Sequence, residues 1–216
     1  MANQETLKSI VILCDFDNTI TRKNVAEFIF EKFAGCGLEH SRRWEKGEIS
    51  SKEEYVLNFA TITASKEEME SYISSIEIDP DFKTLLDFSI EKGYKLAIVS
   101  DGLEWYISYI LALHDIKDVT IYANYLYFEN QGFRLEFPWY GEETPRFGVC
   151  KPEIVRSFQN PWTRVIYIGD GLTDVDVANV ADIIFAKDVL LDYCLAHGIP
   201  AIGINSLSDV MENWIV

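Results

Sequence analysis

Basic side chains are scarce in this chain: 19 lysines and arginines stand against 35 aspartates and glutamates, which gives a formal net charge of −16. Nucleic acids and anionic membrane surfaces attract positive charge, so this balance disfavours both as general partners. A substrate that bears phosphate would need a local positive site. Long hydrophobic runs are also missing, since no apolar stretch approaches the roughly 18 residues that a membrane-spanning helix needs.

Cysteine is rare as well. The chain has four cysteines, which lie far apart, and none belongs to a Cys-x-x-Cys motif. No charged-then-apolar leader precedes the first apolar segment. We therefore expect reduced thiols in a cytoplasmic protein. The three histidines show no metal-ligand spacing, and we expect them to serve packing or the surface.

Short apolar segments alternate with stretches of helical pattern along the chain. Segments of five to seven residues suit a parallel sheet that is covered on both faces. The predicted fold class is therefore α/β, with a doubly wound parallel sheet. With 216 residues, 48% of them hydrophobic, the chain can form one substantial core and a small second lobe. The expected strands are 10–14, 95–100, 119–124, 164–170, 182–186 and 200–204.

The stretch between the first two expected strands is far longer than one crossover helix requires. Its helix starts are marked by two sequences of capping-box form and by a proline suited to a first helical turn. We expect a helical cap at residues 22–84, inserted into a core of residues 1–21 and 85–216. The three helix-start sequences are 51-SKEE-54, 65-SKEE-68 and 79-DPD-81.

Alternating aromatic residues follow the third expected strand, in 124-NYLYFENQGFRLEF-137. The turn residues Asn130-Gln131-Gly132 interrupt this alternation. The segment therefore predicts a β-hairpin.

Polar residues follow three of the expected strands, at the edge where doubly wound sheets bind their ligands. A lysine at a helix start completes the set. Each motif alone has an ordinary explanation as a turn, a helix cap or a surface lysine. Together and in this order they favour a catalytic site. The motifs are 15-DFDNT-19, 99-VSDG-102, 150-CKP-152 and 169-GDGLTD-174.

This arrangement resembles the haloacid-dehalogenase-type phosphatases, in the branch that contains phosphoserine phosphatase. Within that branch the chain is most similar to the methionine-salvage phosphatases, through segments such as 47-GEISSKEE-54, 121-IYANYLYF-128 and 167-YIGDGLTDVDVA-178. The resemblance implies Mg²⁺-dependent hydrolysis of a small phosphorylated metabolite, with 2-hydroxy-3-keto-5-methylthiopentenyl 1-phosphate as the favoured substrate. It also implies that the helical cap covers the active site.

The chemistry of the first motif fits that resemblance. Phosphate monoesters hydrolyse very slowly unaided through a loose transition state, so catalysis depends on positioning and on neutralising charge. Asp15 is the expected nucleophile, which forms an aspartyl-phosphate. Asp17, two residues on and able to face the same side, would protonate the leaving oxygen and then activate water. Carboxylates this close repel one another unless a cation such as Mg²⁺ holds them.

The remaining motif residues take their roles from the resemblance. Lys151 would neutralise Asp15 and one phosphoryl oxygen, and Ser100 at a helix entrance would donate to another. Asp174 would orient either a water on the metal or Lys151. The expected metal ligands are Asp15, Asp170, Asp174 and the main-chain carbonyl of Asp17, and the expected substrate contacts are Ser100, Asp101, Gly102, Thr19, Arg22 and Asn24, the last two near the leaving group.

One departure from the family pattern bears on the substrate. Phosphoserine phosphatases carry an acidic residue nine positions after the nucleophile, where this chain has Asn24. Because asparagine offers no charge to an ammonium group, neutral or keto-sugar-like phosphates come before phosphoserine. Phosphocholine and phosphoethanolamine stay open.

Two further alternatives remain at the level of function. In a phosphotransferase or mutase, the phosphoryl group would pass to a bound sugar instead of water. A catalytically silent binding module is disfavoured by the intact motif residues. The sequence does not indicate an oligomeric state.

Overall fold

The computed structural model describes residues 9–130 and 132–214, and its centre is a seven-stranded sheet in the order β4-β3-β2-β1-β5-β6-β7. Every pairing is parallel except the antiparallel pair β3–β4. The predicted α/β class and doubly wound sheet are confirmed. The strands are β1 (Ser9–Cys14), β2 (Lys95–Leu103), β3 (Thr120–Glu129), β4 (Gly132–Glu136), β5 (Thr163–Gly169), β6 (Ile183–Ala186) and β7 (Ile202–Gly203).

Strand β1 is buried on both faces of the sheet. Ile10, Ile12 and Cys14 belong to one hydrophobic cluster, whereas Val11 and Leu13 belong to another. Successive side chains of a strand point to opposite faces, so one apolar run serves both clusters.

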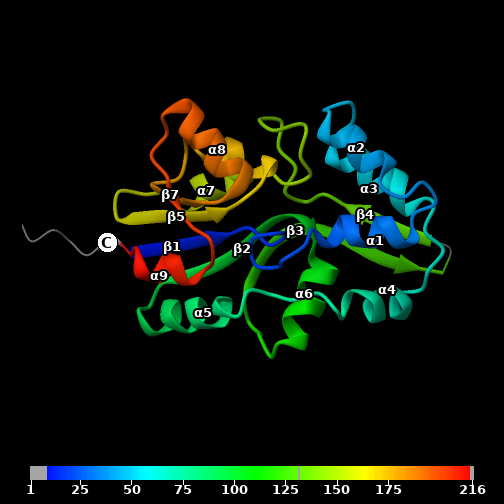
Figure 1. Cartoon of the computed structure of the whole chain (residues 1–216), viewed down its shortest axis with the longest axis horizontal. Coiled ribbons are helices and arrows are strands. Elements are labelled where there is room, and N and C mark those ends of the chain that lie inside the picture. The colour runs from blue at the N-terminus through cyan, green and yellow to red at the C-terminus, as the bar shows by residue number, and fades with distance from the viewer. Residues whose placement is uncertain (1–8, 131, 215–216) are drawn as a thin grey trace, which may run out of the picture.

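Helices cover the two faces of the sheet. Figure 1 shows α5, α6 and α9 on one side of it and α7 and α8 on the other. This arrangement explains why the central strands carry continuous apolar runs instead of alternating ones. The helices are α5 (Asp81–Glu91), α6 (Glu104–Leu113), α7 (Lys151–Phe158), α8 (Asp188–His197) and α9 (Ser208–Glu212), and the 3₁₀ helix η1 spans Leu172–Val177.

Four helices follow β1 and gather at one end of the sheet, beside the β3–β4 hairpin (Figure 1). The chain enters and leaves this lobe side by side, because Thr21 forms an antiparallel bridge with Ile78. Phe59 of the lobe packs against Phe133 of β4, with ring centroids 5.1 Å apart. The helices are α1 (Val25–Phe33), α2 (Glu39–Glu45), α3 (Ser51–Phe59) and α4 (Lys66–Ile73).

The expected boundary between cap and core, after residue 84, falls inside α5. Helix α5 packs against the sheet, and its residues Phe82 and Leu85 are fully buried in the hydrophobic cluster that contains Ile12. The division into cap and core stays a prediction.

Helix α3 begins at a different capping box from the one that the sequence suggested. The N-cap is Ser50, whose hydroxyl accepts from the amide of Glu53 at 3.3 Å, while the Glu53 carboxylate accepts from the Ser50 amide at 2.8 Å. The predicted box at 51-SKEE-54 was wrong by one residue. Ser51 and Glu54 are instead buried, and Ser51 donates a tertiary hydrogen bond to Asp101.

The other helix starts and the hairpin agree more closely with the sequence. The capping box of Ser65 and Glu68 at the start of α4 is confirmed. Pro80 lies at the N-cap of α5, one position before the first helical residue. The predicted hairpin is confirmed by the β3–β4 pair, and Gln131 in its turn lies outside the described residues.

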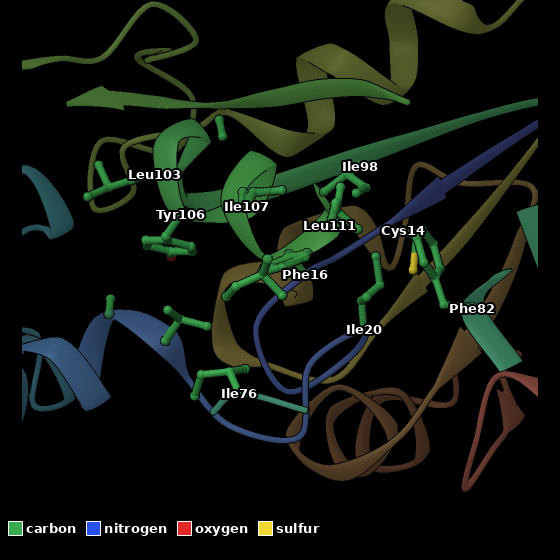
Figure 2. Packing of buried hydrophobic residues seen from close by; sticks show 14 of the residues in the cluster. Cys14, Phe16, Ile20, Ile76, Phe82, Ile98, Leu103, Tyr106, Ile107 and Leu111 are labelled. Atoms are coloured by element: carbon green, nitrogen blue, oxygen red, sulfur yellow. The ribbon is translucent and has the colours of Figure 1, made fainter. Parts of the chain in front are cut away.

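Phe16 stands between the two aspartates of the first motif and is completely buried. Figure 2 shows its ring in the core among Tyr106, Ile107 and Leu111. Asp15 and Asp17, on either side of Phe16, both line a cavity at this end of the strand.

Candidate active site

Three neighbouring strands bring the polar motifs to one edge of the sheet. Asp15 follows β1, Asp170 follows β5, and Ser100 lies near the end of β2, with β1 between the other two. All three side chains line one cavity of about 360 Å³. The edge where parallel strands end is the usual place for ligands in such sheets, and it collects the motifs here.

Lys151, the first residue of α7, holds the centre of this cluster together. Its ammonium group donates to Asp15 Oδ1 at 2.8 Å, to Asp174 Oδ1 at 2.6 Å and to Thr173 Oγ1 at 3.1 Å. Burial lowers the pKa of Lys151, but the charges of Asp15 and Asp174 more than offset it, so the pKa is raised overall. The lysine therefore stays charged. Its predicted contact with Asp15 is confirmed.

Asp174 uses both carboxylate oxygens for hydrogen bonds within the protein. Oδ1 accepts from Lys151 and from the hydroxyl of Tyr167 at 2.5 Å. Oδ2 accepts from the main-chain amides of Asp170 at 3.1 Å and Gly171 at 2.9 Å. Asp174 was expected to orient either a water on the metal or Lys151. Its hydrogen bond with Lys151 fits the second role.

The cluster carries more buried negative charge than one lysine balances. Burial raises the pKa of Asp15 well above its usual range, with Lys151 opposing and Asp174 and Asp170 adding to the rise. Burial, and next the charge of Asp174, raises the pKa of Asp170 to about 7. One oxygen from each of these three aspartates lies within 4.8 Å of the others. Hard oxygen donors with excess negative charge are what Mg²⁺ prefers, so these residues fit that ion.

Asp17 is oriented by one donor from each side of the site. Its Oδ1 accepts from the main-chain amide of Val25 at 2.7 Å, and its Oδ2 accepts from the hydroxyl of Tyr106 at 2.7 Å. Burial raises the pKa of Asp17 to about 6, and the two hydrogen bonds oppose that rise. A carboxyl group that titrates close to neutral pH can both give and take a proton.

Gly102 is required where Tyr106 and Asp17 meet. A Cβ atom at position 102 would collide with the Tyr106 hydroxyl and lie 2.8 Å from Asp17 Oδ2. Asn18, which follows the second aspartate of the first motif, adopts a left-handed backbone with φ of 58°. Asparagine tolerates this conformation better than most residues, so the loop keeps its shape.

Ser100 is not at a helix entrance, so that expectation was wrong. Strand β2 continues to Leu103 and α6 begins only at Glu104. The Ser100 hydroxyl instead accepts from the amide of Gly102 at 3.0 Å, which leaves its own proton free to donate into the cavity. A role in phosphate binding stays a prediction.

Asp101 ties three segments together beside the cavity. Its Oδ1 accepts from the amides of Gly148 at 2.7 Å and Val149 at 2.9 Å, and its Oδ2 accepts from the hydroxyl of Ser51 at 2.5 Å. The side chain therefore fixes the loop before α7 and helix α3 at the site. Asp101 lines the cavity, and its direct contact with substrate stays a prediction.

The other three expected substrate contacts lie in different surroundings. Thr19 donates to Asp170 Oδ1 at 2.6 Å and so holds that carboxylate. Asn24 lines the cavity and caps α1, with its Oδ1 accepting from the amide of Glu27 at 3.0 Å. Arg22 lines a neighbouring cavity instead, together with Lys187.

The lobe contributes residues to the cavity that the motifs did not indicate. Helices α1, α2 and α3 each supply a glutamate, and two aromatic rings stand with them. Helical periodicity shows that these helices have buried faces but not which cavity a face meets. The cap residues in question are Glu27, Trp44, Glu45, Glu54 and Tyr55.

Known proteins are similar to this chain in sequence and in fold. Among curated proteins, the 2-hydroxy-3-keto-5-methylthiopentenyl-1-phosphate phosphatase of Exiguobacterium sibiricum is 30% identical over 212 residues, which cover 95% of this chain and 96% of that protein. A protein of the same name from Brevibacillus brevis is 30% identical over 210 residues, 95% of each chain. A solved phospho-aspartyl intermediate analogue of phosphoserine phosphatase has a TM-score of 0.69 at 20% identity, covering 95% of this chain and 98% of its own.

The last of these likenesses concerns the fold alone, whereas the first two extend over nearly the whole sequence. Residues 12–179 match the description haloacid dehalogenase-like hydrolase, a span that runs from β1 to the end of η1 and includes every motif of the site. The resemblance that the motifs carried is confirmed. The chain belongs to the haloacid dehalogenase-like hydrolase family.

Proposed function

We propose that this protein is a magnesium-dependent phosphomonoesterase that works through an aspartyl-phosphate intermediate. The observation that carries the proposal is the buried cluster of Asp15, Asp170, Asp174 and Lys151. Asp15 and Asp170 of this cluster line one cavity together with Asp17. This set supplies a nucleophile, an acid-base group and fixed positive charge.

The first step is attack on phosphorus by Asp15. One of its oxygens accepts from Lys151, which leaves the other free to form the new bond to phosphorus. As the bond from phosphorus to the ester oxygen breaks, Asp17 gives its proton to that oxygen and the alcohol leaves. Lys151 stays charged and offsets the negative charge on the phosphoryl group.

The second step regenerates the enzyme. A water molecule gives a proton to Asp17 and attacks the phosphorus of the aspartyl-phosphate, which releases inorganic phosphate and the carboxylate of Asp15. Mg²⁺, held by Asp15 and Asp170 with the main-chain carbonyl of Asp17 and with Asp174 beside them, would supply the positive charge that a phosphoryl group needs in a buried site.

The favoured substrate is 2-hydroxy-3-keto-5-methylthiopentenyl 1-phosphate, because relatives at 30% identity over nearly the whole chain bear the name of its phosphatase. The lining of the cavity supports an ester without a second anion. Among the described residues that line it, none is a lysine or arginine. Phosphoserine carries a carboxylate that would meet no basic partner there. Phosphoethanolamine is the second candidate, since three cap glutamates suit its ammonium group.

We also infer a cytoplasmic location. All four cysteines are free, three of them buried, which supports a reducing compartment. In the described part of the chain no helix is both long and apolar enough to cross a membrane.

The test is release of inorganic phosphate from a panel of esters, with Mg²⁺ and with a chelator. The panel contains the methylthiopentenyl phosphate, phosphoethanolamine, phosphocholine, phosphoserine and several sugar phosphates. We expect metal-dependent release, with one phosphate for each alcohol formed. Two results would count against a phosphomonoesterase. One is that none of the esters releases phosphate, and the other is that an ester gives up its phosphoryl group only when an acceptor sugar is present.

A further inference from the structure

Helix α3 supplies to the cavity a carboxylate that the reaction does not use. Glu54 lines the cavity and is only 7% exposed. No hydrogen bond or ion pair to its carboxylate occurs within residues 9–130 and 132–214. The Ser41 hydroxyl nearby is also buried and makes no hydrogen bond in that part of the chain. The carboxylate oxygens of Glu54 are absent from the fully buried unpartnered atoms, so they open into the cavity, where a donor from a ligand would stabilise this poorly solvated group.

The position of Glu54 relative to the reacting groups is fixed through its own helix. Ser51, one turn earlier on the same face of α3, donates to Asp101 Oδ2 at 2.5 Å. Asp101 precedes Gly102, the residue packed against Asp17. The face of α3 that carries Glu54 is therefore tied to the segment beside Asp17, and both carboxylates line the one cavity in which the alcohol part of a bound ester must lie.

The charge around Glu54 limits what can bind there. Glu27 and Glu45 line the same cavity, together with the rings of Trp44 and Tyr55. Burial raises the pKa of Glu54 to about 7, and the negative charges of Asp101, Glu27 and Glu45 add to the rise. The Ser41 hydroxyl lies close enough to oppose the rise, but it is not oriented for a hydrogen bond. A second anion in this poorly solvated region would be repelled.

We propose that Glu54 is a specificity-determining residue, which accepts a hydrogen bond from a hydroxyl or ammonium group on the alcohol part of the substrate. The substrate class is then a phosphate ester whose alcohol part carries such a donor and no negative charge. This inference rests on the phosphomonoesterase function proposed above. A site built to bind a polar group rejects an analogue that lacks the group strongly, because the buried partner is left unpaired.

A matched series of two-carbon esters tests the inference by changing one group at a time. The series is ethyl phosphate, which has no donor, 2-hydroxyethyl phosphate, phosphoethanolamine and phosphoglycolate, which carries a carboxylate. The methylthiopentenyl phosphate is the fifth ester. The readout is kcat/KM with Mg²⁺ for the wild type, for Glu54→Gln and for Glu67→Gln, a control at an exposed position of α4 that removes the same charge elsewhere in the lobe.

In the wild type we expect the esters with a donor to exceed ethyl phosphate by at least about tenfold, and phosphoglycolate to be the poorest. Glu54→Gln should lower kcat/KM for the donor esters by about 10- to 100-fold, change ethyl phosphate by no more than about twofold, and improve phosphoglycolate. Whether the hydroxyl or the ammonium ester loses more identifies the donor. Glu67→Gln should follow the wild type.

Other outcomes overturn the inference without touching the proposed function. If Glu54→Gln slows all five esters equally, the residue does not select the alcohol part. If the variant fails to fold, as seen by its thermal unfolding, the wild-type ranking decides, because equal use of ethyl phosphate and the donor esters, or preference for phosphoglycolate, contradicts the inference. No phosphate release from any ester, p-nitrophenyl phosphate included, would instead remove the phosphomonoesterase itself.

Discussion

The hydroxyl of Tyr106 on α6 donates to Asp17 Oδ2 at 2.7 Å, across 89 residues of sequence. The other oxygen of Asp17 accepts from the first amide of α1, at Val25. A core helix and a lobe helix thus share the task of orienting one carboxyl group. Both bonds favour its charged form, whereas burial favours the neutral form and raises its pKa to about 6.

Tyr106→Phe should move the pH dependence of catalysis. Loss of the hydroxyl removes a hydrogen bond to the charged form, so the pKa of Asp17 rises and proton donation persists to higher pH. We expect the alkaline limb of kcat/KM for an alkyl phosphate to shift upward, with a fall of about tenfold at its maximum because the acid is less well oriented. Tyr109→Phe on the same helix is the control, since titration of the substrate phosphate is common to both variants. If the alkaline limb of kcat/KM does not move in Tyr106→Phe, the Tyr106 hydroxyl does not set the pKa of Asp17.

Lys151→Met should destabilise the protein as well as inactivate it. The lysine is 1% exposed, and its removal leaves Asp15 and Asp174 buried without their cation. Breaking a buried ion pair in this way costs about 3–5 kcal/mol, less at acidic pH, where the carboxylates are protonated. Urea unfolding at pH 7 and pH 5 measures this. Lys92→Met, at an exposed position, should change the free energy of unfolding by less than about 0.5 kcal/mol. A similarly small change for Lys151→Met would show that the cluster is not held by its charge.

Gly102→Ala should damage the site more than the fold. The new methyl group would collide with the Tyr106 hydroxyl and crowd Asp17 Oδ2 at 2.8 Å. We expect overpacking to lower the free energy of unfolding by about 1–3 kcal/mol, so that the protein still folds. We expect kcat to lose most of its wild-type value. Gly35→Ala is the matched control, because a Cβ there would meet Thr61 at an ordinary 3.5 Å. Full activity in Gly102→Ala would mean that the Tyr106 hydroxyl can move without consequence.

The metal-free protein should lose stability as the pH rises, in part through Glu54. Its pKa is about 7 in the folded protein against 4.5 for an ordinary glutamate. A raised folded pKa contributes stability that is fully present below the ordinary value and is lost as the pH passes the folded value. The shift of about 2.5 units corresponds to about 3 kcal/mol. Denaturant unfolding in chelator at pH 4.5 and pH 8 should show a smaller difference for Glu54→Gln than for the wild type, and equal differences would contradict the assignment.

The sequence was most informative where a short motif follows a strand. Asp15, Ser100 and Asp170 could be placed together because parallel strands end at one edge, and this needs only the strand pattern and its order. Lys151 could be added from its motif and its helix start. The fold class could be predicted for the same reason, since continuous apolar runs fit only a doubly covered sheet.

The lobe was less predictable because its register depends on tertiary contacts. The sequence 50-SSKEE-54 contains two overlapping capping boxes, and local chemistry does not choose between them. The hydrogen bond of Ser51 with Asp101 and the burial of Glu54 choose the earlier one. For the same reason the sequence alone does not reveal Tyr106 as the partner of Asp17.

The most direct test of the aspartyl-phosphate mechanism is to find the phosphoryl group on the enzyme. Wild type, Asp17→Asn and Asp15→Asn are mixed with p-nitrophenyl phosphate and Mg²⁺, quenched in acid and analysed by peptide mass spectrometry. We expect a phosphoryl group on Asp15. It should accumulate in Asp17→Asn, because p-nitrophenol leaves without a proton while water is no longer activated. Asp15→Asn should fold normally, carry no phosphoryl group and release no phosphate. Undiminished release from Asp15→Asn, or a phosphoryl group on another residue, would contradict the role of Asp15 as nucleophile.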